Sequence, residues 1–136
     1  MNALVRVLVL SVGGALGVNA RYWLGVAMGR WAGDRFPWAT VTINVTGSFA
    51  VGFLAVALSR VWPHPLGRLF VVTGFLGGYT TFSSFALESL ILWETGQRRL
   101  AVANTVGSVA VGLAAVALGV ALARAALGPM PGGEGG

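Results

Sequence analysis

The sequence predicts an all-α membrane protein with four transmembrane helices per subunit, and three observations support this prediction. Hydrophobic residues make up 56% of the 136 residues and charged residues only 10%, which is too apolar for a soluble domain of this length. Tryptophans 31, 38, 62 and 93 lie where an interfacial aromatic belt is expected. The apolar residues form four stretches, each near the ~20 residues that cross a bilayer, at about 4–28, 39–60, 66–93 and 100–126.

These stretches predict one transmembrane domain over residues 1–127, followed by a disordered tail over 128–136 that is rich in glycine and proline. The first stretch resembles a signal peptide in its apolarity. It runs too long, however, carries Asn19 and Arg21 near its end, and leads directly into three more spans. We therefore expect it to be retained as the first helix.

Several kinds of site are disfavoured by composition. The chain has no cysteine, which excludes a disulfide scaffold and a thiolate metal site. Its single histidine, His64, stands in the proline-bearing segment "RVWPHPLGR" and is best interpreted as a loop residue. The net charge of +5 comes from arginines scattered at the ends of the spans, so nucleic-acid binding is not expected.

The placement of the arginines bears on topology. If the four helices cross in turn, equal numbers of arginines flank the two membrane faces, whereas orientation is normally set by an excess of Lys and Arg on one face. We therefore expect insertion in both orientations and an antiparallel homodimer, although a chance balance would look the same. Arg21 is left out because it lies within a span; the two sets are Arg6, Arg60, Arg68 and Arg124 against Arg30, Arg35, Arg98 and Arg99.

Small residues recur at a spacing of four, which lets helix backbones approach closely in lipid. In so short a chain this spacing favours self-association, although packing of the four helices within one subunit would use the same glycines. The pairs are Gly13/Gly17, Gly25/Gly29, Gly74/Gly78 and Ser108/Gly112.

Polar side chains also occur inside the spans, where they serve either to join helices or to line a polar route. The second stretch holds Asn44 among several hydroxyls, and the fourth holds Asn104 and Ser108. Glu88 is the one acidic residue within a span, and an intramembrane carboxylate is a functional candidate by default. Arg21 either snorkels outward or acts as an intramembrane cation.

The segment "GGYTTFSSF", from Gly77 to Phe85, interrupts the third stretch. Its glycines disfavour a continuous helix, because each is about 1 kcal/mol worse than Ala. We expect a break at the centre of the helix, with free carbonyls that suit a hard cation such as Na⁺. Phe82 and Phe85 share a face and could present positive ring edges to a small anion. The residues alone thus indicate a polar-lined channel or transporter of unknown substrate.

The same segment closely resembles the third-helix signature of the Fluc (CrcB) fluoride channels. Three further segments resemble other patterns of that family, in order along nearly the whole chain. They are "GGALGVNARY" for the first helix, "TVTINVTGSFAVG" for the second and "NTVGSVAVG" for the fourth.

This resemblance implies a passive fluoride channel, not an enzyme, in the plasma membrane of a bacterial or archaeal cell. It implies an antiparallel homodimer with two fluoride pores and a structural Na⁺ at its centre. Phe82 and Phe85 would meet fluoride with their ring edges, and the carbonyls of Gly77 and Thr80 would hold the Na⁺. The remaining implied residues are Asn44 along the pore, Ser84, Glu88 and Ser108 on a polar track, and Arg21 as the first-helix arginine.

Departures from the family pattern are mild: Ser84 stands where many relatives have Thr, Tyr79 is at a variable position, and Gly112 leaves the fourth helix without a further hydroxyl.

Two rival functions are compared with that of a fluoride channel. A small multidrug exporter has four helices, but its proton coupling needs a carboxylate in the first helix, and 4–28 contains none. A structural subunit of a membrane assembly would show neither fluoride flux nor a central cation.

Overall fold

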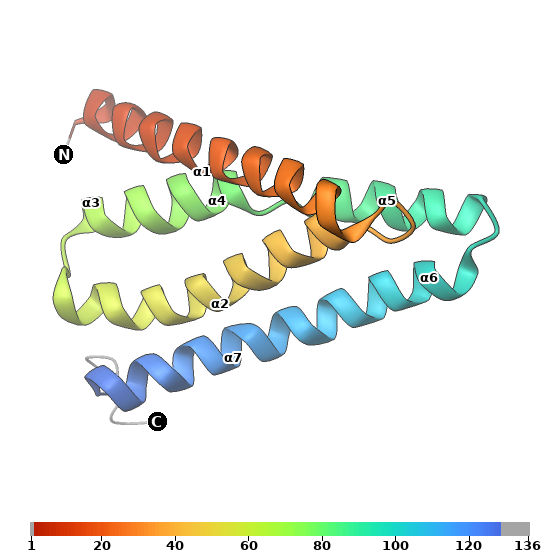
Figure 1. Ribbon diagram of the computed structural model, residues 1–136. Coiled ribbons are helices and arrows are strands. Elements are labelled where there is room, and N and C mark those ends of the chain that lie inside the picture. The colour runs from red at the N-terminus through yellow and green to blue at the C-terminus, as the bar shows by residue number, and fades with distance from the viewer. Residues whose placement is uncertain (1, 129–136) are drawn as a thin grey trace.

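The computed structural model describes residues 2–128 (Figure 1). Every secondary-structure element within this range is a helix, and the helices make up four segments that are long and apolar enough to cross a membrane, which confirms the prediction of four transmembrane helices. Apart from Gly128, the predicted tail 128–136 lies outside the described residues. The four segments are Ala3–Ala32, Trp38–Val61, Pro65–Glu94 and Arg98–Leu127.

The first two segments are single helices, α1 (Ala3–Ala32) and α2 (Trp38–Val61). The other two contain π-helical turns, a wide form that is rare and often found at functional sites. The third segment is built from α3 (Pro65–Arg68), η1 (Leu69–Leu76), α4 (Gly77–Tyr79) and α5 (Phe82–Glu94), and the fourth from α6 (Arg98–Val102), η2 (Ala103–Gly107) and α7 (Ser108–Leu127).

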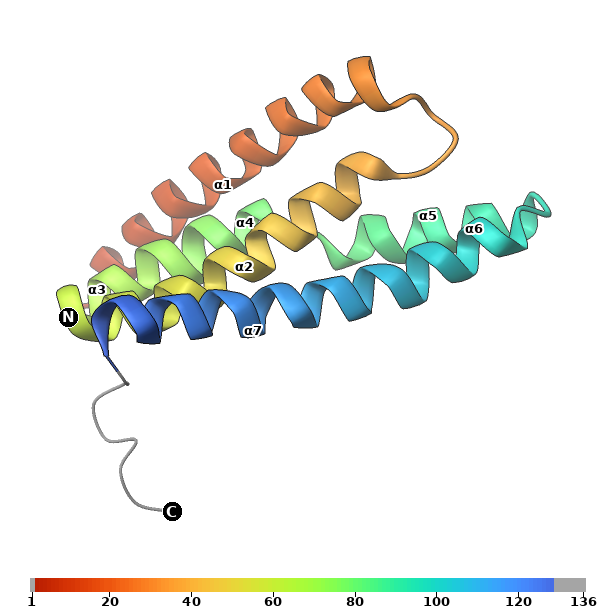
Figure 2. The same cartoon turned by 60° about the horizontal axis from the view of Figure 1, so that its bottom comes forward.

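The helices cross in alternate directions. The start of α1, the α2–α3 connection and the end of α7 lie at one end of the bundle, and the α1–α2 and α5–α6 connections lie at the other (Figures 1 and 2). The turns follow from local chemistry: Gly33 and Gly96 adopt φ values of 68° and 79°, which glycine tolerates best. The two arginine sets identified from the sequence are therefore separated along the bundle axis.

Glycines allow two close helix pairs inside the subunit. A Cβ on Gly13 would lie 2.7 Å from the Phe70 carbonyl oxygen, and one on Gly78 would lie 2.6 Å from that of Gly14, so α1 packs backbone to backbone on η1 and α4. Gly52 and Gly119 do the same between α2 and α7. Intrasubunit packing thus accounts for two of the four predicted pairs, Gly13/Gly17 and Gly74/Gly78. Gly25 and Gly29 have nothing within 4 Å, and a Cβ on Gly112 would meet only Ser48 Oγ, at 3.6 Å.

Candidate functional site

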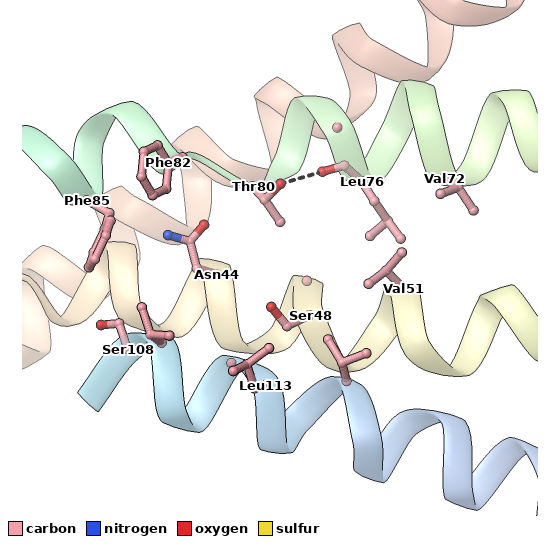
Figure 3. A pocket seen from close by; sticks show the side chains of 15 residues that line it. Asn44, Ser48, Val51, Val72, Leu76, Thr80, Phe82, Phe85, Ser108 and Leu113 are labelled. Carbon is pink, nitrogen blue, oxygen red and sulfur yellow. Dashed lines mark hydrogen bonds between the residues drawn. The ribbon is translucent and has the colours of Figure 1, made fainter. Parts of the chain in front are cut away.

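A cavity of about 480 Å³ opens between α2, the middle of the third span and α7 (Figure 3). Its walls are mainly apolar, with a few polar groups from each element. Six residues predicted from the sequence line it together, although they are separated by up to 64 positions along the chain: Asn44, Gly77, Thr80, Phe82, Phe85 and Ser108. Ser48, which was not among the predicted site residues, also lines it.

The backbone beside this cavity leaves helical geometry at Thr80 and Thr81, which we call the extended pair. Their φ/ψ values are −81°/157° and −147°/107°. The sequence placed the change of geometry at Gly77–Thr80, but Gly77 itself is helical, with φ −64° and ψ −35°. Gly78 serves close packing instead, since it faces Gly14 of α1, whereas a Cβ on Gly77 would meet only the Val72 carbonyl oxygen, at 3.9 Å.

The side chain of Asn44 in α2 forms hydrogen bonds with the backbone of Thr81, the second residue of the extended pair. Its side-chain Oδ1 accepts the Thr81 N–H at 2.8 Å, and its Nδ2 donates to the Thr81 carbonyl at 2.9 Å. Backbone groups in a membrane need such a partner where no helical bond is available. Asn44 retains one amide hydrogen that can be donated to a ligand in the cavity.

The four carbonyls from Gly77 to Thr80, at the same place, have no donor within residues 2–128. The Thr81 N–H, which would continue the helix to the Gly77 carbonyl, bonds to Asn44, and the Ser84 N–H, which would reach the Thr80 carbonyl, bonds to Thr81 Oγ1. Unpaired carbonyl oxygens are suitable ligands for a hard cation. The described part of the chain holds no cluster of three carboxylate or imidazole side chains, so a metal ion there would depend on such carbonyls.

Phe82 and Phe85 lie side by side at the start of α5. Their ring centroids are 5.5 Å apart and the ring planes are inclined by 47°. Phe85 is buried, with 8% of its surface exposed, whereas Phe82 is 77% exposed in the single chain. Both rings line the cavity, but the Phe85 ring is enclosed in its wall, whereas the Phe82 ring is accessible on the open side.

Ser84 lies in the first turn of α5, which is capped by Thr81, and it does not line the cavity. The Ser84 N–H donates to Thr81 Oγ1 at 3.3 Å, and the Thr81 hydroxyl donates to Ser84 Oγ at 3.0 Å. The Ser84 hydroxyl hydrogen is donated to no group among residues 2–128 and is free to serve a ligand.

A chain of three hydrogen bonds links Ser108 of α7 to the Phe85 carbonyl of α5. The Ser108 hydroxyl donates to Asn104 Oδ1 at 3.2 Å, Asn104 Nδ2 donates to Ser89 Oγ at 2.9 Å, and the Ser89 hydroxyl donates to the Phe85 carbonyl at 2.7 Å. Asn104 is fully buried. The sequence showed Asn104 only as one polar residue of the fourth span; the small hydroxyl four positions later was the available signal for its role.

Glu88 lies apart from the phenylalanines, at a second cavity of about 290 Å³. That cavity also contacts Asp34 and Arg35 of the α1–α2 connection. Glu88 Oε1 accepts the Thr40 hydroxyl at 2.8 Å, whereas Oε2 is buried and has no partner among residues 2–128. Arg21, half-buried on α1, lines neither cavity and forms no hydrogen bond or ion pair within the described range.

Comparison with known proteins places the chain in a family. Residues 8–120 match the family described as CrcB-like protein, Camphor Resistance (CrcB). A protein of Rhodospirillum centenum is 46% identical over 122 residues, which cover 89% of this chain and 97% of that protein. One of Rhizobium meliloti is 47% identical over 121 residues, covering 88% and 97%, and one of Nitrobacter winogradskyi is 43% identical over 119 residues, covering 87% and 94%.

All three relatives carry the name fluoride-specific ion channel FluC, which denotes a transport protein and not an enzyme. The match extends across all four membrane-crossing segments of the structure. This chain therefore belongs to the CrcB-like family as a multi-pass protein of the cell membrane.

Proposed function

We propose that this chain forms a fluoride-selective channel through which toxic cytoplasmic fluoride leaves the cell passively, down its electrochemical gradient. The observation that carries the proposal is the convergence of Phe82, Phe85, Asn44 and Ser108 on one cavity in a chain whose relatives are named fluoride-specific channels. Fluoride is strongly hydrated, so a pore must replace its water with several donors at close range.

The phenylalanines and Asn44 would provide the first of these donors. The edge of a phenyl ring carries partial positive charge, so it attracts an anion weakly and lets it leave again. Phe85 is held in the wall, and the remaining amide hydrogen of Asn44 adds a stronger donor beside it. Selection against larger halides would come from a narrow pore.

The polar track would continue on either side of these groups. Ser84 has a free hydroxyl hydrogen, whereas Ser108 must first break its bond to Asn104 before it can donate to an anion. We place Glu88 with Thr40 farther along, at the second cavity. Arg21 would contribute positive charge to a vestibule.

An antiparallel homodimer with two pores would complete the site. The cavity is open on one side in a single chain, and Phe82 is largely exposed there. The balanced arginines at the two ends support insertion in both orientations. A Na⁺ at the dimer centre would neutralise the partial negative charge of carbonyls, and Gly77 and Thr80, with their symmetry mates, are the residues that would hold it. The helix break at the extended pair is what leaves those carbonyls free.

Fluoride efflux from proteoliposomes, followed with a fluoride electrode, tests the function. The unaltered protein is expected to conduct, and Phe82→Ile or Phe85→Ile is expected to abolish efflux while the protein stays folded. Phe53→Ile is the matched control, because Phe53 stacks on Phe49 outside the cavity. Absence of fluoride flux in the unaltered protein rejects the proposal and favours a structural subunit. Full transport in both cavity variants rejects the role given to the rings.

Topology and the cation can be tested separately. Because the chain has no cysteine, Gln97→Cys in the exposed α5–α6 connection gives a single labelling site. A membrane-impermeant maleimide is expected to label about half of the molecules in sealed vesicles if the two orientations are equal. Labelling of all or none of the molecules contradicts dual topology.

Replacing Na⁺ by choline should lower the melting temperature of the detergent-solubilised protein, and an unchanged melting temperature argues against the cation site.

A further inference from the structure

We infer that Ser48 is an additional anion-binding hydroxyl of the cavity, continuing from Asn44 along α2. The inference rests on the proposed function and adds a donor to its pore. Ser48 follows Asn44 by four positions, so both lie on one face of α2. Figure 3 shows the two side chains on successive turns, both directed into the cavity between α2 and the other walls.

The hydroxyl of Ser48 has no hydrogen-bond partner in the described part of the chain. Serine and threonine in membrane helices usually donate to a carbonyl of their own helix, and Ser59, Ser89 and Thr105 do so here. Ser48 forms no hydrogen bond within residues 2–128. Three other serine or threonine hydroxyls in that range also lack one, but they do not line this cavity: Ser11, Thr42 and Thr73.

The wall opposite Ser48 leaves room for a ligand. Gly112 of α7 has no side chain, and a Cβ built on it would lie 3.6 Å from Ser48 Oγ, at ordinary van der Waals distance. The space beside the hydroxyl is therefore not filled from α7. A small anion can approach Ser48 at this point.

Ser48 also differs from the neighbouring hydroxyl of α7. Ser108 already donates its only hydroxyl hydrogen to Asn104, so it needs a change of rotamer before it can donate to an anion. Ser48 can donate as it stands. Ser48 can therefore donate directly to an anion beside Asn44, at a position where the facing residue of α7 is Gly112 and has no hydroxyl.

Fluoride efflux with Ser48→Ala tests the inference. The loss of one hydrogen bond to a charged ligand should slow efflux by roughly tenfold. Ser59→Ala, whose hydroxyl bonds to the Val56 carbonyl away from the cavity, should keep the unaltered rate. The double variant Ser48→Ala with Gly112→Ser supplies a hydroxyl from the facing wall, and it should recover to within about threefold of the unaltered rate.

The outcomes separate this inference from the function itself. If the unaltered protein does not conduct fluoride, the proposed function fails. If it conducts and Ser48→Ala conducts equally well, or if the double variant stays as slow as Ser48→Ala, the inference is overturned. Should Ser48→Ala fail to assemble, Ser48→Thr and Ser48→Val decide, because they share a shape and differ in the hydroxyl. Slower efflux with Val supports the inference, and equal efflux overturns it.

Discussion

The two halves of the third span are held in place by different means. From Pro65 to Gly78 no side chain of the described structure forms a hydrogen bond to another helix, and α1 contacts this half through glycine backbones. From Tyr79 to Glu94 hydrogen bonds tie the span to α2 through Thr46, Asn44 and Thr40, and to the fourth span through Asn104. Close backbone packing thus positions the first half of the span, whereas hydrogen bonds position the second half.

The difference explains where the candidate site lies. Close glycine packing leaves no space beside α1, so the first half can act as a rigid support. The second half carries the phenylalanines and hydroxyls, whose positions depend on a few bonds that can be remade. The extended pair joins the two halves, and its first residue, Thr80, lines the cavity.

The largest expected effect concerns the shape-packed half. An alanine at Gly17 would overlap the Phe75 carbonyl oxygen, so Gly17→Ala should lower the free energy of unfolding by about 3 kcal/mol. Gly25→Ala, with nothing within 4 Å, should be neutral or slightly stabilising. Unfolding in mixed micelles, followed by tryptophan fluorescence, measures both. Equal stability of the two variants would mean that α1 does not depend on close approach.

The extended pair should show the next largest effect. Asn44→Ala removes both partners of the Thr81 backbone and should destabilise the fold by about 2 kcal/mol. Amide hydrogen exchange at Thr81 should also accelerate. Asn19→Ala is the control, because the Asn19 amide bonds only to the Ala15 carbonyl of its own helix. Unchanged exchange in Asn44→Ala would show that the pair is held by something other than this side chain.

The bond between the third and fourth spans should contribute less. Asn104→Ala is expected to reduce the free energy of unfolding by about 1 kcal/mol, near the usual value for a polar contact between membrane helices. A double-mutant cycle with Ser89→Ala isolates the pairwise part. A coupling energy near zero would remove Asn104 from the set of bonds that hold the second half.

The smallest effect is expected at Thr40. Thr40→Val keeps the side-chain shape and removes the donor to Glu88, so a loss of about 0.6 kcal/mol is expected. Thr105→Val, whose hydroxyl bonds within its own helix, serves as the control for stability. A loss above that caused by Asn104→Ala would reverse this ranking and point to Glu88 as a main support of α5.

Most of the fold was predictable because apolar length and proline-bearing breaks are local properties. The predicted spans 39–60 and 66–93 match Trp38–Val61 and Pro65–Glu94 to within one residue at each end. The position of the extended pair was less accessible. Glycine propensity pointed to Gly77, whereas the geometry depends on Asn44, which lies 37 positions before Thr81.

The candidate site was likewise predictable only in part from the sequence. Phe82 and Phe85 could be paired from their spacing, and they do lie together. That Glu88 faces a second cavity with the α1–α2 connection, and that Ser48 faces Gly112, depends on how the helices are rotated against each other. Such rotations come from packing between distant segments, which a single sequence does not display.

The bond between Asn44 and Thr81 has a consequence for biosynthesis. During synthesis the second span leaves the ribosome before the third, so Asn44 is already in the membrane when the extended pair arrives. The Thr81 backbone amide can therefore bond to Asn44 as soon as the two segments meet, which shortens the time that it spends unpaired in hydrocarbon. A circularly permuted chain that delivers α5 before α2 would lose this order, and we expect the translocon to release it less efficiently into the bilayer.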